Sequence, residues 1–145
     1  MIMTLKQKSL DKYAQYLESL SSSTINSLDD YVSDNVRFKD PFNDVRGSEK
    51  MKAVFLHMFD HIEDVKFSVH RVYRNDDGGC LEWTFCGKFM NRNWSFDGTS
   101  IVILHTNGLV LEHIDHWDAA SSFLERIPIL GWIIKLIRKR IMITG

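Results

Sequence analysis

The spacing of apolar residues changes near residue 62, and this change limits the fold more than any other feature of the sequence. Between residues 4 and 62, apolar side chains mostly recur with the period of amphipathic helices. Between residues 65 and 118, they alternate with polar side chains, as in half-buried β-strands. Helices followed by a run of strands predict an α+β fold. Turn sequences predict that antiparallel hairpins connect these strands: Asn75–Gly79, Asn91–Asn93 and Asn107–Gly108.

The first part of the chain divides into helices around one short strand. The first helix is expected from about Thr4 to Leu20, because Thr4 and Gln7 have the spacing of a capping box. A second helix should follow the break at residues 21–24, and a third should run from Gly47 to about Ile62. Between them, residues 34–42 alternate apolar and charged side chains, which predicts a strand.

Size and composition are those of a single globular domain over residues 1–145. The net charge of −1 gives no overall attraction to nucleic acid. Cys80 and Cys86 would lie roughly 20 Å apart on one extended strand, too far for a disulfide, and free thiols favour a reducing compartment. The N-terminal residues lack the apolar region of a signal peptide, and Ile127–Ile134 is too short to span a bilayer. We therefore expect a cytoplasmic protein.

The stretch Leu109–Asp118 starts as an alternating strand and ends in a cluster of titratable side chains. Alternation places His113, Asp115 and Trp117 on one face and Val110 on the other. A buried strand that ends in such groups can form a pocket wall with Asp115 as an acid/base, or it can simply end in solvent. Asp118 has the position of a helix cap, so we place it outside the site.

Asp40 and Tyr16 are further candidates in the helical part. Asp40 lies between Phe38 and Phe42, and a carboxylate that loses hydration among aromatic rings becomes a better base. The alternative is that Asp40 and the following proline form an ordinary turn. Tyr16 lies beside the apolar stripe of the first helix, where its phenol either donates into a pocket or packs.

One metal-like spacing occurs, at His57 and His61, four residues apart on a predicted helix. No neighbouring Glu or Cys supplies a third ligand, so we expect no metal. The sequence has neither a P-loop nor a dinucleotide-binding fingerprint, so we expect no other cofactor.

The C-terminal segment, residues 128–141, combines an apolar stripe with basic residues. Residues 120–145 contain five basic side chains and one acid, a net charge of +4. Such a helix can cover the pocket, bind a partner subunit or contact an anionic membrane surface.

These elements together resemble the nuclear transport factor 2-like superfamily, particularly its SnoaL-like branch. The resemblance covers nearly the whole chain and depends on two motifs, Ser33–Pro41 and Glu112–Ala119. The ending, Phe123–Arg140, is similar to a group of bacterial members with unassigned function. The resemblance implies a curved antiparallel sheet wrapped as a cone around the N-terminal helices, with a pocket in its open end and a C-terminal helix.

The resemblance also implies roles for single residues. In ketosteroid isomerases of this fold, an Asp before Pro is the base and a Tyr of the first helix stabilises the oxyanion, and Asp40 and Tyr16 match these positions. A protonated Asp provides the second oxyanion donor, but Ser100 is the nearest residue here, which argues against a strict steroid isomerase. The cyclase branch uses an acid/base Asp late in the sheet, which matches Asp115. The Arg of the epoxide hydrolases has no convincing counterpart.

We therefore expect a small-molecule pocket protein, with Asp40, Asp115 and Tyr16 as catalytic residues for isomerisation or cyclisation of a hydrophobic carbonyl compound. A homodimer is expected, because sheets of this kind often pair through their outer faces. The alternative is a non-catalytic module that binds a ligand or a protein, or that docks on a membrane through residues 128–141. The expected substrate contacts are Phe38, Phe42, Trp83, Ser100, His113 and Trp117.

Overall fold

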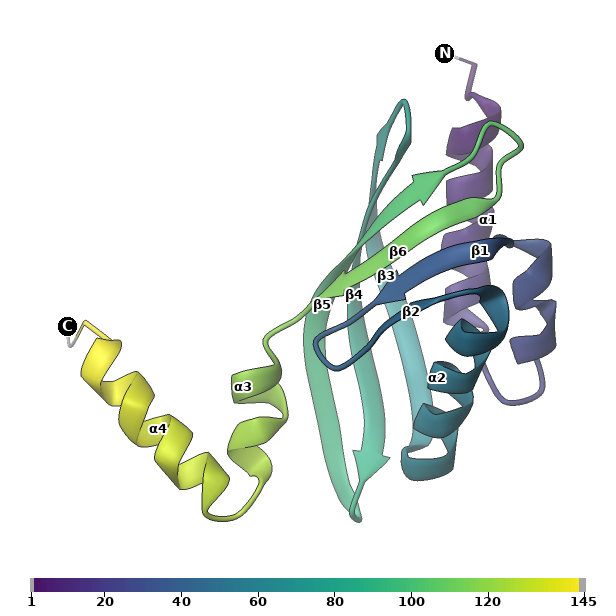
Figure 1. The fold of residues 1–145 in the computed structure, drawn as a ribbon. Helices are drawn as coiled ribbons and strands as arrows, with labels where there is room; N and C mark the ends of the chain where they lie inside the picture. Colours follow the sequence, from purple (N-terminus) through teal and green to yellow (C-terminus); the bar gives the residue numbers. More distant parts are fainter. Residues whose placement is uncertain (1, 144–145) are drawn as a thin grey trace.

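The computed structural model describes residues 2–143; Met1, Thr144 and Gly145 of the predicted domain lie outside the described residues. Figure 1 shows helices arranged around a curved sheet, with the C-terminal helix standing apart from it. The elements in chain order are α1 (Leu5–Glu18), the 3-10 helix η1 (Ile25–Asp30), β1 (Val32–Lys39), β2 (Asp44–Arg46), α2 (Ser48–His61), β3 (Glu63–Asn75), β4 (Gly78–Phe89), β5 (Arg92–Leu104), β6 (Val110–His116), α3 (Ala119–Ser122), the 3-10 helix η2 (Leu124–Arg126) and α4 (Leu130–Ile141).

The six strands form one sheet in the order β2-β1-β6-β5-β4-β3. The predicted antiparallel meander from β3 to β6 is confirmed by the register of each pair. The prediction of a purely antiparallel sheet is wrong in one place, because β1 and β6 pair in parallel. These two strands are far apart in sequence, so no hairpin turn fixes their relative direction.

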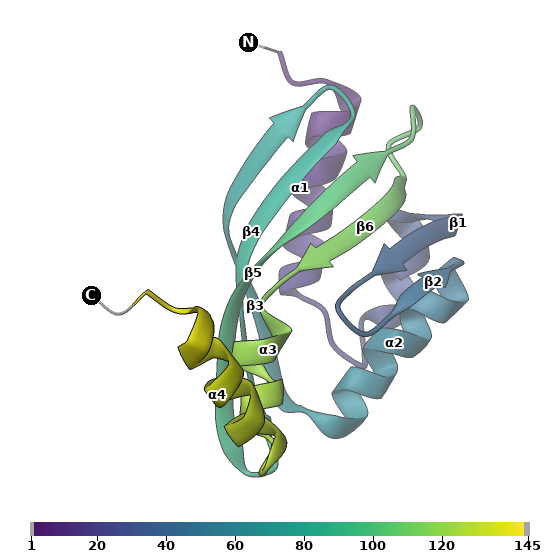
Figure 2. The ribbon, with the colours of Figure 1, turned by 60° about the vertical axis from the view of Figure 1, so that its left-hand side comes forward.

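The sheet curves because several strand pairs contain irregularities. The β3–β4 register shifts twice, between Glu63 and Lys66 and between Val69 and Arg71. Such bulges bend a strand and increase its twist. Helices α1 and α2 lie against the curved sheet (Figure 2), and buried side chains from both layers form one core. The predicted α+β cone with a C-terminal helix is therefore confirmed.

Local sequence determines where α1 begins and why η1 is short. Thr4 and Gln7 form the predicted capping box at the start of α1. The second predicted helix is shorter than expected, because residues 25–30 form only a 3-10 turn and Val32 already belongs to β1. The residues Asn26, Ser27 and Asp29 favour turns over α-helix, since their side chains compete for backbone hydrogen bonds.

Strand β6 departs from strict alternation at its start. Glu112 pairs with Ile103, but Val110 pairs with the next residue of β5, Leu104, so Leu111 is an extra residue in a bulge. The prediction that Val110 faces away from His113 is therefore wrong, because both side chains are buried. After the bulge, alternation holds and places His113 and Asp115 on the inner side.

Helix α4 is attached through a short joint at η2. A Cβ on Gly131 would lie 2.0 Å from the carbonyl oxygen of Glu125, so the two backbones approach too closely for any other residue. Arg138 forms an ion pair with Glu125 at 2.5 Å. Within residues 2–143, no helix combines the length and apolar character needed to cross a bilayer.

Candidate functional site

Asp115 is the centre of a cluster on the inner face of the sheet. The strand register places Asp115 of β6 opposite Ser100 of β5, and His113 beside Phe38 of β1. His113 and Ser100 are buried, and the side chain of Asp115 is 14% exposed. The predicted inward orientation of His113 and Asp115 is confirmed.

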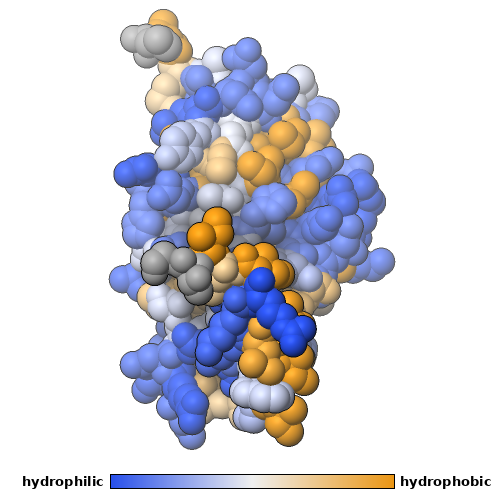
Figure 3. Space-filling model, turned by 90° about the vertical axis from the view of Figure 1, so that its left-hand side faces the viewer, coloured by the Kyte–Doolittle hydropathy of each residue, from blue (hydrophilic) through white to orange (hydrophobic). Residues whose placement is uncertain are grey.

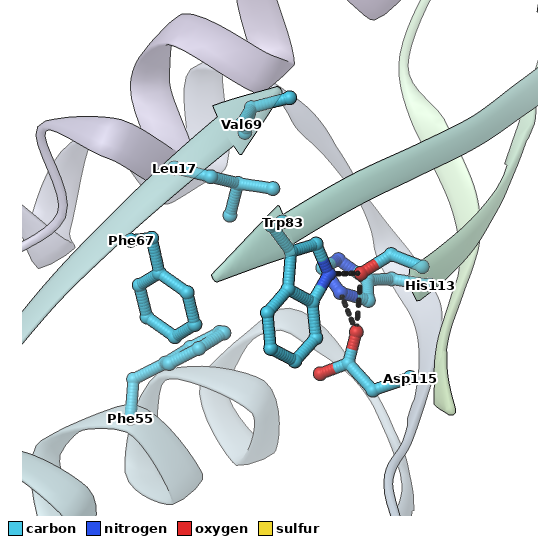
Figure 4. Close-up of a pocket in the computed structure, with 8 residues that line it drawn as sticks. Leu17, Phe55, Phe67, Val69, Trp83, His113 and Asp115 are labelled. Carbon is cyan, nitrogen blue, oxygen red and sulfur yellow. Dashed lines mark hydrogen bonds and ion pairs between the residues drawn. The ribbon is translucent and has the colours of Figure 1, made fainter. Parts of the chain in front are cut away.

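A chain of hydrogen bonds connects this cluster from the core to Asp115 (Figure 4). The Trp83 indole Nε1–H donates to Ser100 Oγ at 2.8 Å, and the Ser100 hydroxyl donates to Asp115 Oδ1 at 2.5 Å. His113 Nε2 lies 2.7 Å from the same Oδ1, and its Nδ1 lies 2.6 Å from the hydroxyl of Tyr13. Two donors therefore hold one oxygen of the carboxylate.

The network defines the tautomer of His113. A carboxylate only accepts hydrogen bonds, so Nε2 carries the hydrogen that is donated to Asp115. In a neutral imidazole Nδ1 is then an acceptor, and the Tyr13 hydroxyl donates to it. Burial and the nearby negative charge of Asp115 raise the pKa of Tyr13 well above its usual value, so the phenol keeps its proton. Each polar hydrogen of the cluster therefore makes one hydrogen bond: Trp83 to Ser100, Ser100 and His113 to Asp115, and Tyr13 to His113.

Trp83 is positioned by a glycine on the neighbouring strand. Gly98 pairs with Trp83 across β4 and β5, and a Cβ at Gly98 would lie 2.4 Å from the indole ring. The absent side chain lets the indole lie against the strand and reach Ser100.

The interior of the cone is almost filled. The cavity beside Asp115 has a volume of about 20 Å³. That space holds about one water molecule. The cavity therefore cannot receive an organic ligand in this conformation. The side chains around it, shown in Figure 4, are Leu17, Phe55, Phe67, Val69, Trp83, Ser100, His113 and Asp115.

A larger depression also has Asp115 in its lining. Its volume is about 450 Å³, which is in the range of small-molecule sites. Asp115 Oδ2 accepts no hydrogen bond from the described residues, and Figure 4 shows it away from His113, on the side of Phe55 and Trp83. No side-chain oxygen or nitrogen in the described part of the chain is both fully buried and unpartnered, so Oδ2 reaches solvent. The depression is lined by Lys39, Asp40, Pro41, Ile114, Asp115, His116 and Trp117.

Asp40 lies at the rim of this depression and caps a turn. Its Oδ1 accepts from the backbone N–H groups of Phe42 and Asn43 at 2.7 and 2.6 Å, and the Asn43 side-chain amide contacts both of its oxygens at 3.1 Å. The structure thus brings Asp40 and Asp115 to one depression, as the sequence suggested. The carboxylate of Asp40 accepts hydrogen bonds within its own turn and the neighbouring Phe42 is 54% exposed, so the expected enclosure among aromatic rings is wrong.

Tyr16 does not reach the cluster around Asp115. Its hydroxyl donates to the carbonyl oxygens of Thr24 and Ile25 at 2.9 and 3.3 Å, and its ring stacks on Tyr31. Burial is the main reason that the pKa of Tyr16 is raised to about 12. The prediction that Tyr16 donates into the pocket is wrong, because this hydroxyl is used to connect α1 to η1.

Tyr13 is the tyrosine of α1 that reaches the site, and the sequence analysis did not single it out. A signal was present, because a tyrosine in the middle of an apolar stripe needs a polar partner for its hydroxyl. Lys39 was also missed; it is the last residue of β1 and lines the depression.

The predicted aromatic contacts occupy three different environments. Phe38 is buried beside Phe55 and His113 and belongs to the core. Phe42 is 54% exposed and touches Trp117 edge-on, so its predicted place inside the pocket is wrong. Trp117 lines the depression and stacks on Phe96 with ring centroids 4.2 Å apart.

The histidine pair on α2 does not form part of a metal site within residues 2–143, where no group of three or more possible ligands comes together. The His61 Nδ1–H donates to the carbonyl oxygen of His57 at 2.8 Å. His61 Nδ1 therefore makes a hydrogen bond within α2 and is not available as a metal ligand.

Solved structures with the same fold include proteins of different kinds. An NTF2-like protein of unknown function from Exiguobacterium is 21% identical, with a TM-score of 0.65, over 76% of this chain and 98% of that one. An LEH-like epoxide hydrolase from M. tuberculosis is 14% identical, with a TM-score of 0.71, over 99% of this chain and 100% of that one. These similarities establish the fold alone.

The family comparison covers most of the chain and ends two residues before Asp115. A protein from Catenulispora acidiphila with a ketosteroid isomerase-like fold, solved with trimethylamine, is a further neighbour at 13% identity and a TM-score of 0.69, over 79% of this chain and 88% of that one. No curated protein matches the sequence significantly. The model of the SnoaL-like domain matches residues 13–113, which include Tyr13, Ser100 and His113, and the chain therefore belongs to the SnoaL-like domain family.

Proposed function

We propose that this protein catalyses proton transfer on a hydrophobic carbonyl compound, as an isomerase or a cyclase, with Asp115 as the reacting acid/base. One observation carries the proposal: Ser100 and His113 hold Oδ1 of Asp115, Oδ2 accepts no hydrogen bond from the described residues, and Asp115 lines the depression. A general base needs this combination of fixed orientation and one available oxygen.

In the proposed reaction, Asp115 Oδ2 takes a proton from the carbon next to the substrate carbonyl. The electron pair of the broken C–H bond moves toward the carbonyl oxygen and forms an enolate. Isomerisation returns the proton to another carbon of the conjugated system. In cyclisation, the enolate carbon attacks a second carbonyl of the same molecule, and the new alkoxide takes the proton.

Other residues of the depression supply binding and charge. Pro41, Ile114 and Trp117 offer an apolar surface for the carbon skeleton, and Lys39 offers a positive charge to a developing enolate oxygen. We assign Asp40 to shaping the rim, because its turn already uses both carboxylate oxygens. Tyr13 and His113 act through Asp115 as positioning residues.

Turnover of enolisable cyclic ketones, compared between the wild type and Asp115→Asn, tests this proposal. The substitution keeps the size of the side chain and removes the base, so we expect the rate to fall by about 10²–10⁴-fold. Asp40→Asn is the matched control and should keep most of the activity. Wild-type turnover that survives Asp115→Asn, or that is lost only in Asp40→Asn, would refute the assignment.

A second candidate function is a non-catalytic binding module. It is favoured by the filled interior, whose cavity of about 20 Å³ leaves no room for a ligand, and by a network in which each polar hydrogen has a partner. This function predicts saturable binding of apolar carbonyl compounds in the depression without turnover, and equal affinities for the wild type and Asp115→Asn. Calorimetry with both proteins, beside the turnover assay, separates the two functions.

A further inference from the structure

Helix α4 uses only a small part of its surface to contact the rest of the chain. Its main contacts are with η2. Gly131 is its buried residue and lies against the backbone of Glu125, and Arg138 pairs with Glu125 from the same side of the helix. Figure 1 shows α4 standing away from the sheet. The remaining faces of α4 are therefore free to meet something outside the described chain.

The free side of α4 is apolar to an unusual degree. Ile133, Leu136 and Ile137 are 43%, 42% and 54% exposed, and Trp132 and Ile141 are 66% and 77% exposed. Their spacing places most of them on one stripe of the helix. Figure 3 shows this apolar surface next to strongly hydrophilic side chains. Such a contiguous apolar patch indicates an interaction surface rather than a solvent-facing helix.

The charges on α4 are all positive. The helix contains Lys135, Arg138, Lys139 and Arg140 and no acidic residue. Arg138 is paired with Glu125, whereas no carboxylate among residues 2–143 lies within ion-pair distance of the other three. The partner of this surface must therefore combine apolar groups with negative charge.

We propose that α4 docks this protein on the surface of a membrane that contains anionic lipids. A helix of 12 residues is about 18 Å long, so it lies in the interface, with its apolar stripe among the acyl chains and its basic residues at the phosphates. Trp132 suits the boundary between these layers. A second copy of the chain fits less well, because two α4 helices packed together would bring like charges into contact without any acid to offset them. This inference does not depend on the proposed acid/base activity.

The turn before α4 supports an external apolar partner. Ile129 has φ 72° and ψ −58°, and Leu130 N–H donates to the Pro128 carbonyl oxygen at 2.8 Å, so these residues form a strained γ-turn. A β-branched residue is unfavourable there, and glycine would adopt the conformation more easily. The Ile129 side chain is 78% exposed and so gains little from the protein itself. Insertion into a lipid layer would explain its presence.

Vesicle co-sedimentation of the full chain tests the proposal. The wild type is compared on pure phosphatidylcholine and on phosphatidylcholine with about 30 mol% phosphatidylglycerol, a strongly anionic surface. The key variant changes Lys135, Lys139 and Arg140 to Glu and leaves the Arg138–Glu125 pair intact. The matched control changes three exposed lysines outside α4, Lys8, Lys12 and Lys66, to Glu, so that the net charge changes equally.

We expect binding to the anionic vesicles and little to the neutral ones. Each basic residue near an anionic surface contributes about a fivefold factor, so the α4 variant should bind about a hundredfold more weakly or not at all, whereas the control should bind. Ile133→Ser combined with Ile137→Ser should also abolish binding while leaving the circular dichroism spectrum unchanged, because both side chains are exposed. Ile129→Gly should weaken binding while raising thermal stability.

Several results would overturn the proposal. These are no binding of the wild type to anionic vesicles, equal binding to neutral and anionic vesicles, or equal losses in the α4 variant and the lysine control. Sedimentation velocity without lipid tests the alternative that a second copy of the chain covers α4. A dimer that dissociates in the variant with Ile133→Ser and Ile137→Ser would show that a second copy, and not a membrane, covers α4.

Discussion

Replacing Tyr13 by phenylalanine tests the buried half of the network. Tyr13 and His113 are 1% and 2% exposed as whole residues, and the Tyr13 hydroxyl lies 2.6 Å from His113 Nδ1. The substitution removes the only donor that the described residues offer to this nitrogen. Water cannot easily replace it, because the adjacent cavity holds about one molecule.

The expected cost follows from the burial of both partners. A buried acceptor left without a donor costs roughly 1–3 kcal/mol, more than the net worth of an average hydrogen bond. For a chain of this size, each kcal/mol lowers the midpoint of thermal unfolding by about 2–4 °C. We therefore expect Tyr13→Phe to lower the midpoint by about 4–8 °C for a loss near 2 kcal/mol.

Urea denaturation and differential scanning calorimetry measure this change. Tyr31→Phe is the matched control, because the Tyr31 ring stacks on Tyr16 but its hydroxyl makes no hydrogen bond to the described residues. It should change the free energy of unfolding by less than about 0.5 kcal/mol. Equal stabilities of Tyr13→Phe and Tyr31→Phe would refute the hydrogen-bonding scheme at His113.

Three further predictions concern packing, pH and capping. Gly98→Ala should destabilise the fold by about 1–3 kcal/mol in urea denaturation, because its Cβ would lie 2.4 Å from the Trp83 ring; a neutral effect would contradict that close approach. Burial raises the pKa of Tyr13, and raises that of Tyr16 to about 12, so each contributes stability that is complete below about pH 10 and lost as the pH rises toward the folded pKa. The free energy of unfolding should fall by roughly 1.4 kcal/mol per pH unit per tyrosine in that window, and a flat profile would show that the phenols are hydrated. Asp118→Ala should cost about 1 kcal/mol in calorimetry, because Asp118 accepts from the Ser121 N–H at 3.1 Å, and no loss would mean that α3 needs no cap.

Local patterns in the sequence predicted most elements of the fold. The capping box at Thr4 and Gln7, the hairpin at Asn107–Gly108 and the alternation after Leu111 all reflect short-range geometry that the chain carries in itself. The same alternation placed His113 and Asp115 together on the inner face.

Features that depend on long-range contacts could not be predicted in this way. The bulge at Leu111 exists only in the pairing with β5, and the parallel pairing of β1 with β6 joins distant segments. The choice between Tyr13 and Tyr16 depends on the rotation of α1 against the sheet, which the spacing of its apolar residues did not resolve.

Asp40 shows how a local alternative competes with a resemblance to known enzymes. The family motif predicted a base, whereas ordinary turn chemistry predicted hydrogen bonds to the backbone just after the aspartate. The structure has those turn contacts, to Phe42 and Asn43. The carboxylate that retains a free oxygen is Asp115.

Exchange of a substrate proton with solvent tests the central proposal most directly. The wild type and Asp115→Asn are incubated in deuterium oxide with an enolisable cyclic ketone, and proton NMR follows the loss of the signal from the carbon next to the carbonyl. This measurement detects proton abstraction even when no product forms. The proposed role of Asp115 predicts fast exchange with the wild type and exchange at the uncatalysed rate with Asp115→Asn. Equal exchange rates with both proteins would contradict it.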